Sequence, residues 1–204
     1  MSDWRQKLPM QLSMSRVYIV PLLLLLMWPQ THLFNFLAAV LFICGSITDY
    51  YDGYFARKYN AVSNLGKFMD PVTDKVLVSS VLILMVAQGK VDSFLVVILL
   101  ARDTIIGGIR SAAAADQVVI AAKASGKWKT GLQMSAIPAL ILSQYHRGQM
   151  RLSEINWADW ESYLYIIGWL GYVVLWASVV LSLVSGYEYY QIFKRESQSA
   201  KALL

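Results

Sequence analysis

Six apolar blocks divide this sequence, and they leave few folds open to it. The blocks cover residues 14–28, 33–55, 66–87, 91–114, 129–145 and 163–189. A helix needs roughly 20 apolar residues to cross the hydrocarbon core of a membrane. Hydrophobic residues make up 57% of the 204 residues and charged residues only 15%, which is atypical of a soluble domain. We therefore predict an all-α integral membrane bundle of six transmembrane helices with a short N-terminal interfacial segment, formed by residues 1–204 as a single domain.

Lysine and arginine are distributed unequally between the two sets of expected loops. Only three lie on the side opposite the N-terminus, namely Lys90, Arg147 and Arg151. Eleven lie on the N-terminal side: Arg5, Lys7, Arg57, Lys58, Lys67, Lys123, Lys127, Lys129, Lys194, Arg195 and Lys201. The positive-inside rule therefore predicts both termini in the cytoplasm. Because these cations lie between apolar blocks, the net charge of +5 indicates membrane topology and anionic lipid or phosphate, and not nucleic acid. The single cysteine, Cys44, excludes a disulfide framework.

Four aspartates lie close together at the second and third blocks. Asp49 and Asp52 are three residues apart and Asp70 and Asp74 are four apart, so each pair shares one face of a helix. A helix that starts at residue 33 reaches Asp49 after ~24 Å, in a core ~30 Å thick. A helix that ends at residue 88 places Asp70 and Asp74 ~27 and ~21 Å from that end. All four carboxylates are thus expected at one depth, near the cytoplasmic end.

Four carboxylates that converge in a low dielectric repel one another, and therefore need a cation. Oxygen donors without nearby histidine or cysteine favour Mg2+ or Mn2+ over zinc or copper, and four carboxylates predict two ions. The alternative is that the aspartates cap helix ends, which explains one such residue better than four at matched depth.

Small residues accompany the aspartates. Gly53, Ala56 and Gly66 leave the helix surfaces thin beside the carboxylates, as a bulky ligand would need, although helix packing also favours small residues. Arg57 offers a planar donor for phosphate; its ordinary alternative is a surface arginine that snorkels to the interface.

Taken together, these residues resemble the signature of the CDP-alcohol phosphatidyltransferases. The resemblance holds at eight fixed positions: Asp49, Asp52, Gly53, Ala56, Arg57, Gly66, Asp70 and Asp74. Three further segments, LPMQLSMSRVYIVP, ARDTIIGGIRSAAA and SGKWKTGLQ, are similar to bacterial members of that family. The resemblance covers most of the chain through the fifth block. The part from His146 onward carries no motif that indicates a function.

The resemblance implies roles for the signature residues. Asp49, Asp52 and Asp70 become the main metal ligands, and Asp74 becomes the general base with possible metal contact. The nucleotide of CDP-diacylglycerol is expected beside Asp52, Gly53, Ala56, Arg57 and Gly66. The family also implies a homodimer and a site on the cytoplasmic side of the bacterial inner membrane, among membrane lipids.

A dianionic acceptor such as glycerol 3-phosphate requires cations at the depth of the aspartates. Arg102 and Arg110 lie ~17 and ~29 Å along a helix from residue 91, and their separation of ~80° lets both face inward. Lys127 and Lys129 are expected at the level of Arg110, although both also fit an ordinary positive flank. Arg102 is deeper and requires a partner, either Asp103 or an anion in the pocket. Arg16 is also not expected to face lipid.

The sequence therefore favours transfer of a phosphatidyl group from CDP-diacylglycerol to glycerol 3-phosphate. Another acceptor, such as inositol phosphate, would use the same basic residues. An aspartate-rich membrane prenyltransferase would carry two separated acidic motifs, whereas this chain has one cluster. A small ion transporter would spread acidic residues through the membrane, but the fifth and sixth blocks have none in their interiors.

Overall fold

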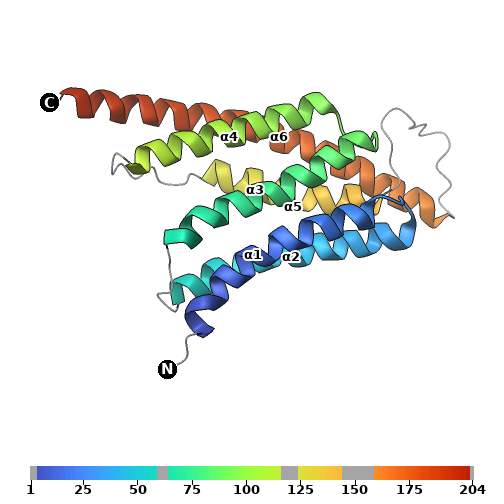
Figure 1. The fold of residues 1–204 in the computed structure, drawn as a ribbon. Helices are drawn as coiled ribbons and strands as arrows, with labels where there is room; N and C mark the ends of the chain where they lie inside the picture. Colours follow the sequence, from blue (N-terminus) through green and yellow to red (C-terminus); the bar gives the residue numbers. More distant parts are fainter. Residues whose placement is uncertain (1–3, 59–63, 116–123, 144–158, 203–204) are drawn as a thin grey trace.

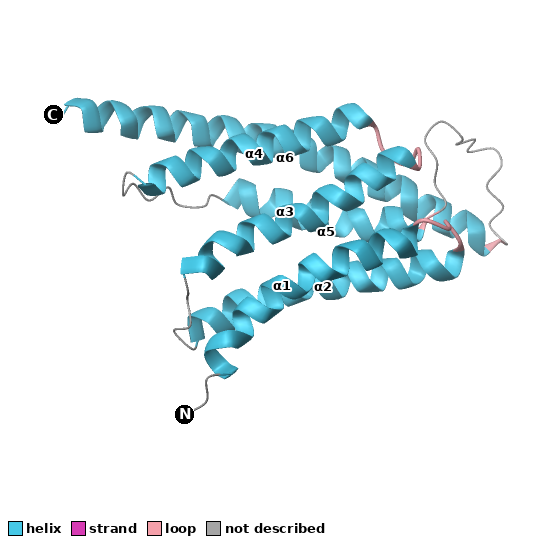
Figure 2. Cartoon of the chain, in the orientation of Figure 1, coloured by secondary structure: helices cyan, strands magenta, loops and turns pink. Residues whose placement is uncertain are grey.

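The computed structural model describes residues 4–58, 64–115, 124–143 and 159–202, and within them the side chains of 16–48, 72, 73, 75–109, 111, 126–143 and 159–192. The described part of the chain is helical and contains no strand (Figure 2). The six helices are α1 (Trp4–Met27), α2 (His32–Lys58), α3 (Asn64–Ala87), α4 (Ser93–Ala115), α5 (Ala124–Leu142) and α6 (Trp160–Ala202). The prediction of an all-α fold is confirmed.

The helices run alternately up and down one long axis (Figure 1). The start of α1 and the end of α6 lie at the same end of the molecule, together with the end of α2 and the start of α3. The end of α4 and the start of α5 also point to this end, which we call the aspartate end because the four aspartates belong to these helix termini. Every expected block corresponds to one helix, in the expected order.

The helix boundaries extend beyond the apolar blocks. α1 begins at Trp4, so the expected interfacial segment is the first part of α1 and not a separate element. α6 has 43 residues and continues to Ala202, well past the end of the sixth block. At 1.5 Å per residue it is ~64 Å long, about twice the thickness of a hydrocarbon core.

The core runs the length of the bundle. α1 packs against α2 and α3, and α5 packs against α6 and α2. Each helix contributes at least one fully buried apolar side chain: Leu23, Phe42, Leu82, Leu99, Ile137 and Leu175. Gly171 brings α6 against α5, since a methyl group there would lie 3.0 Å from the Ala139 Cβ and 3.1 Å from the Ala136 carbonyl oxygen. Such close helix contact through small residues is typical of membrane bundles.

Large apolar side chains also cover much of the outer surface. Leu25, Phe94, Val97 and Val180 are each more than half exposed, on three different helices. Within the described residues, Trp160–Ile192 is the one helix long and apolar enough to cross a membrane, and three shorter apolar segments cover Arg16–Met27, His32–Thr48 and Lys75–Ala87. Extended apolar surface of this kind marks contact with lipid or with other proteins.

The turn between α3 and α4 is fixed by a glycine and a buried lysine. Gly89 has φ of 71°, and the amides of Gly89 and Lys90 donate to the carbonyls of Val86 and Met85, which closes the helix in a Schellman motif. The Lys90 ammonium then donates to the carbonyl oxygens of Leu140 and Ser143, 3.1 and 2.7 Å away, at the end of α5. Burial lowers the pKa of Lys90 to about 8, so the ammonium still holds its proton at neutral pH. A cation placed there also complements the helix dipole.

Candidate active site

The four aspartates occupy matching positions on α2 and α3. Asp52 lies six residues before the end of α2 and Asp70 six residues after the start of α3, so each is ~9 Å of helix from its terminus. Asp49 and Asp74 lie nine and ten residues from the same termini, or ~14 and ~15 Å. The end of α2 and the start of α3 lie at the same end of the bundle (Figure 1).

Leu77 on α3 approaches Gly45 on α2 one turn from the aspartates along both helices. A methyl group at Gly45 on α2 would lie 3.6 Å from Leu77 Cδ2 on α3 and 3.9 Å from Ile19 on α1. Gly45 precedes Asp49 by four residues and Leu77 follows Asp74 by three. Asp49 and Asp74 therefore lie one turn from a point at which α2 approaches α3, while the more extensive contacts of both helices are with α1.

The side chains of the signature residues lie outside the described side chains. This applies to Asp49, Asp52, Gly53, Ala56, Arg57, Gly66, Asp70 and Asp74, and also to Arg110. Among the side chains that are described, no group of three or more His, Cys, Asp or Glu residues could hold a metal ion. The metal ligands therefore remain predictions, supported by the placement of their helices.

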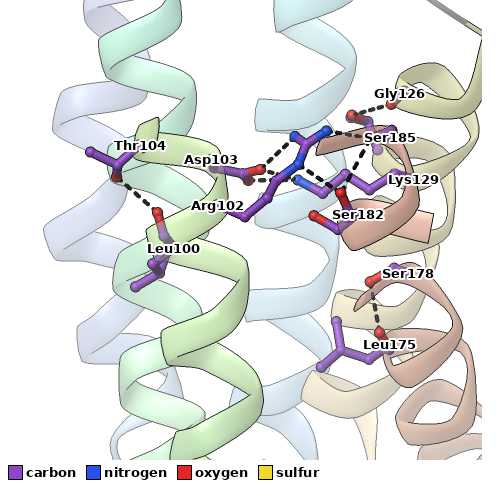
Figure 3. A network of polar contacts seen from close by, with 11 residues as sticks. Leu100, Arg102, Asp103, Thr104, Gly126, Lys129, Leu175, Ser178, Ser182 and Ser185 are labelled. Atoms are coloured by element: carbon purple, nitrogen blue, oxygen red, sulfur yellow. Dashed lines mark hydrogen bonds and ion pairs between the residues drawn. The ribbon is translucent and has the colours of Figure 1, made fainter. Parts of the chain in front are cut away.

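Two of the four predicted acceptor cations meet at a single carboxylate on α4 (Figure 3). The Asp103 Oδ1 atom accepts from Arg102 Nη1 at 3.0 Å and from Lys129 Nζ at 2.8 Å. Lys129 Nζ also lies 2.5 Å from Asp103 Oδ2. The side chains of Lys129, Arg102 and Asp103 are 6%, 13% and 23% exposed. Arg102 thus has a partner, as its depth required, and Asp103 is that partner.

α6 completes this cluster. Arg102 Nε donates to the Ser182 carbonyl oxygen at 2.9 Å, and Arg102 Nη2 donates to the Ser185 hydroxyl (Figure 3). Gly186 leaves room for the guanidinium, because a methyl group there would lie 3.4 Å from Arg102 Nε. We call Arg102, Asp103, Lys129, Ser182 and Ser185 the Asp103 cluster; it joins α4, α5 and α6 and carries one net positive charge.

The predicted acceptor cations therefore differ in environment. Lys129 meets Asp103, which lies seven residues, or ~10 Å of helix, before Arg110. Lys127 is exposed near the start of α5. Arg110 lies five residues before the end of α4, so its backbone is at the aspartate end. Arg16 is fully buried, in agreement with the expectation that it does not face lipid.

Sequence reasoning did not identify Ser182, Ser185 or Gly186 as partners of Arg102. Their spacing offers a weak signal, because Ser178, Ser182 and Ser185 are all fully buried along one face of an otherwise apolar helix. Small polar residues at such spacing are typical of interhelical contacts in membranes. The packing of α4 against α6 decides which cation donates hydrogen bonds to these serines.

A family model for CDP-alcohol phosphatidyltransferases matches residues 6–184. The chain belongs to the CDP-alcohol phosphatidyltransferase family. The match spans the four aspartates and most of the Asp103 cluster, of which only Ser185 lies beyond the matched range, by one residue. The resemblance drawn from the signature is thereby confirmed.

Relatives within the CDP-alcohol phosphatidyltransferases cover nearly the whole chain. A protein of Rickettsia typhi is 35% identical over 93% of this chain and 98% of its own length. A protein of Bacillus subtilis is 34% identical over 90% of this chain and 93% of its own length. One from Mycoplasma pneumoniae is 38% identical, over 94% and 89% respectively. All three are named CDP-diacylglycerol–glycerol-3-phosphate 3-phosphatidyltransferase.

Proposed function

We propose that this chain transfers the phosphatidyl group of CDP-diacylglycerol to glycerol 3-phosphate and releases CMP. The observation that carries the proposal is that relatives from three bacterial genera match this chain nearly end to end and share one name for this reaction. The basic residues at the aspartate end support an acceptor that carries a phosphate, because neutral serine or inositol would not need them.

We propose that Asp49, Asp52, Asp70 and Asp74 hold two divalent ions, Mg2+ or Mn2+. The matched depth of the four residues and the Gly45–Leu77 contact between their helices support this assignment. When bound, such ions neutralise a diphosphate and stabilise the departing CMP. Gly53, Ala56, Arg57 and Gly66 line the nucleotide site in this proposal, together with Asp52.

Asp74 then acts as the general base. It takes the proton of the acceptor hydroxyl as that oxygen attacks the phosphorus that carries diacylglycerol. The new bond joins the acceptor oxygen to phosphorus, and the bond from phosphorus to the bridging oxygen of CMP breaks. The leaving group departs with the electron pair of that bond.

Arg110 and Lys127 are the acceptor-phosphate ligands in this proposal. Lys127 is exposed at the start of α5, and Arg110 lies near the end of α4. Arg102 and Lys129 are engaged by Asp103 and contribute the net positive charge of the cluster behind them. We assign these two residues to the inner wall of the acceptor site.

In this proposal the bundle crosses the bacterial inner membrane six times. Exposed apolar side chains on several helices support lipid contact, and the lysine and arginine excess supports a cytoplasmic aspartate end, with both termini there. The diphosphate of a liponucleotide lies at the membrane surface, where this end would meet it. The homodimer implied by the family stays a prediction.

The acceptor is tested with the purified protein in detergent with CDP-diacylglycerol and Mg2+. Glycerol 3-phosphate, serine, inositol and inositol phosphate are offered separately, and release of CMP is measured. We expect release with glycerol 3-phosphate and only background with the neutral acceptors. Comparable release with serine and none with glycerol 3-phosphate would defeat the assignment, and preference for inositol phosphate would move the chain to the other phosphorylated acceptor.

Arg110→Ala should raise the KM for glycerol 3-phosphate far more than that for CDP-diacylglycerol. A hydrogen bond to a charged group contributes roughly 1.5–3 kcal/mol, so the KM should rise about 10- to 150-fold. Steady-state kinetics with each substrate varied in turn provides the measurement. Arg147→Ala, between α5 and α6 in the sequence, serves as the control. A larger effect on the liponucleotide would instead place Arg110 at the nucleotide.

A further inference from the structure

A lysine on α3 rests against a glycine on α4, beside the candidate active site. A methyl group added at Gly107 would collide with Lys75 Nζ and would lie 3.6 Å from Lys75 Cε. The next residue, Gly108, has no atom within 4 Å of such a methyl group. The two adjacent glycines therefore differ in their surroundings. The Lys75 ammonium lies against the backbone of α4 at Gly107 and not at Gly108.

Among the described side chains, Lys75 has no hydrogen bond or ion pair, and it is exposed. An ordinary lysine near a membrane interface snorkels toward water. Lys75, by contrast, extends across the seam between α3 and α4 to Gly107, and it lies eleven residues, or ~17 Å, inward from the start of α3. A positive charge at that depth is costly without an anion.

The position of Lys75 relates it to two residues of the proposed site. Asp74, the candidate base, precedes it directly in the sequence. Gly107 and Arg110 are three residues apart on α4 and so share one helix face. Lys75 and Arg110 therefore belong to the same seam, one from each helix.

We propose that Lys75 is a binding residue for the phosphate of the acceptor, and that Gly107 positions it. This inference rests on the proposed function and adds a residue to its acceptor site. The ligand is a phosphate monoester dianion, which two cations from facing helices hold better than one. The diphosphate of the liponucleotide has similar chemistry, and the kinetics of the two substrates distinguish between these sources.

The test compares Lys75→Gln, Gly107→Ala and Gly108→Ala in the full-length enzyme with Mg2+. Lys75→Gln should raise the KM for glycerol 3-phosphate roughly tenfold or more, because a charge-assisted hydrogen bond is lost, and should leave the KM for CDP-diacylglycerol within about twofold. Gly107→Ala should raise the same KM by a smaller factor, since the flexible lysine can shift. Gly108→Ala should behave as the unaltered enzyme, because its methyl group meets nothing.

An unchanged KM for glycerol 3-phosphate in both Lys75→Gln and Gly107→Ala would overturn the inference. A rise confined to the KM for CDP-diacylglycerol would also overturn it, and would assign Lys75 to the diphosphate. If Lys75→Gln fails to fold, Gly107→Ala decides, since it displaces the ammonium without removing it. Failure of the proposed function is separate, because the unaltered enzyme would then release no CMP with glycerol 3-phosphate.

Discussion

Asp74→Asn is expected to abolish turnover while the protein still binds CDP-diacylglycerol. An amide has nearly the shape of the carboxylate but cannot take the proton of the attacking hydroxyl, and loss of a general base costs roughly 10²- to 10⁴-fold in rate. Asp74 lies one turn from Leu77, which approaches Gly45 of α2. The measurement is kcat from CMP release, alongside calorimetric titration with the liponucleotide.

Asp92→Asn is the matched control for this change. Asp92 lies at the opposite end of the bundle, where it accepts a hydrogen bond from the Tyr172 hydroxyl, and the asparagine oxygen can still accept that bond. We expect it to retain activity close to that of the unaltered enzyme. An Asp74→Asn enzyme with turnover within about tenfold of the unaltered one would remove Asp74 as the base.

Asp103→Asn is expected to destabilise the fold more than any other single change at the Asp103 cluster. It leaves the Lys129 ammonium and the Arg102 guanidinium close together without the carboxylate that now lies between them. Removal of one partner from a buried ion pair costs roughly 3–5 kcal/mol. Because Asp103 is 23% exposed, we expect a loss near the lower end of that range. Thermal unfolding of the protein in detergent provides the measurement.

A second substitution separates charge from packing at this cluster. The double variant Asp103→Asn, Lys129→Met removes one stranded cation while it keeps the length of the lysine side chain. It should recover much of the stability lost in Asp103→Asn, because contacting charges are coupled in double-mutant cycles. Additive effects of the two substitutions would show that Asp103 and Lys129 do not stabilise each other.

The order of the helices could be predicted from the sequence, whereas their ends could not. Apolar runs mark the part of a helix that is buried in lipid or core, so the six blocks correspond to α1 to α6. The largely polar residues from Lys194 onward continue α6 to Ala202, and the segment from Ala124 to Lys127 begins α5. Hydrophobicity carries no signal there, since polar residues such as Lys and Glu are good helix formers.

The candidate site has two halves, the aspartates and the basic residues, and the sequence predicted the position of the first half more fully than that of the second. The depth of Asp49, Asp52, Asp70 and Asp74 follows from the rise per residue, and the helix ends agree with it. The depth of Arg102 required a partner, which is found in Asp103. The structure pairs the Lys129 ammonium with Asp103, ~10 Å of helix before Arg110 on α4, a pairing that the sequence did not predict.

The sequence by itself determined the helical bundle, the end at which acidic and basic residues gather, and the family signature. These properties depend on composition and spacing along one chain segment at a time. The tertiary structure decided that Asp103 binds two cations, that Ser182 and Ser185 complete their contacts, and that Lys75 rests on Gly107 and not on Gly108. Neighbouring residues on a helix point 100° apart, so such contacts depend on the rotation and axial offset of each helix against its neighbours, which packing of the whole bundle sets.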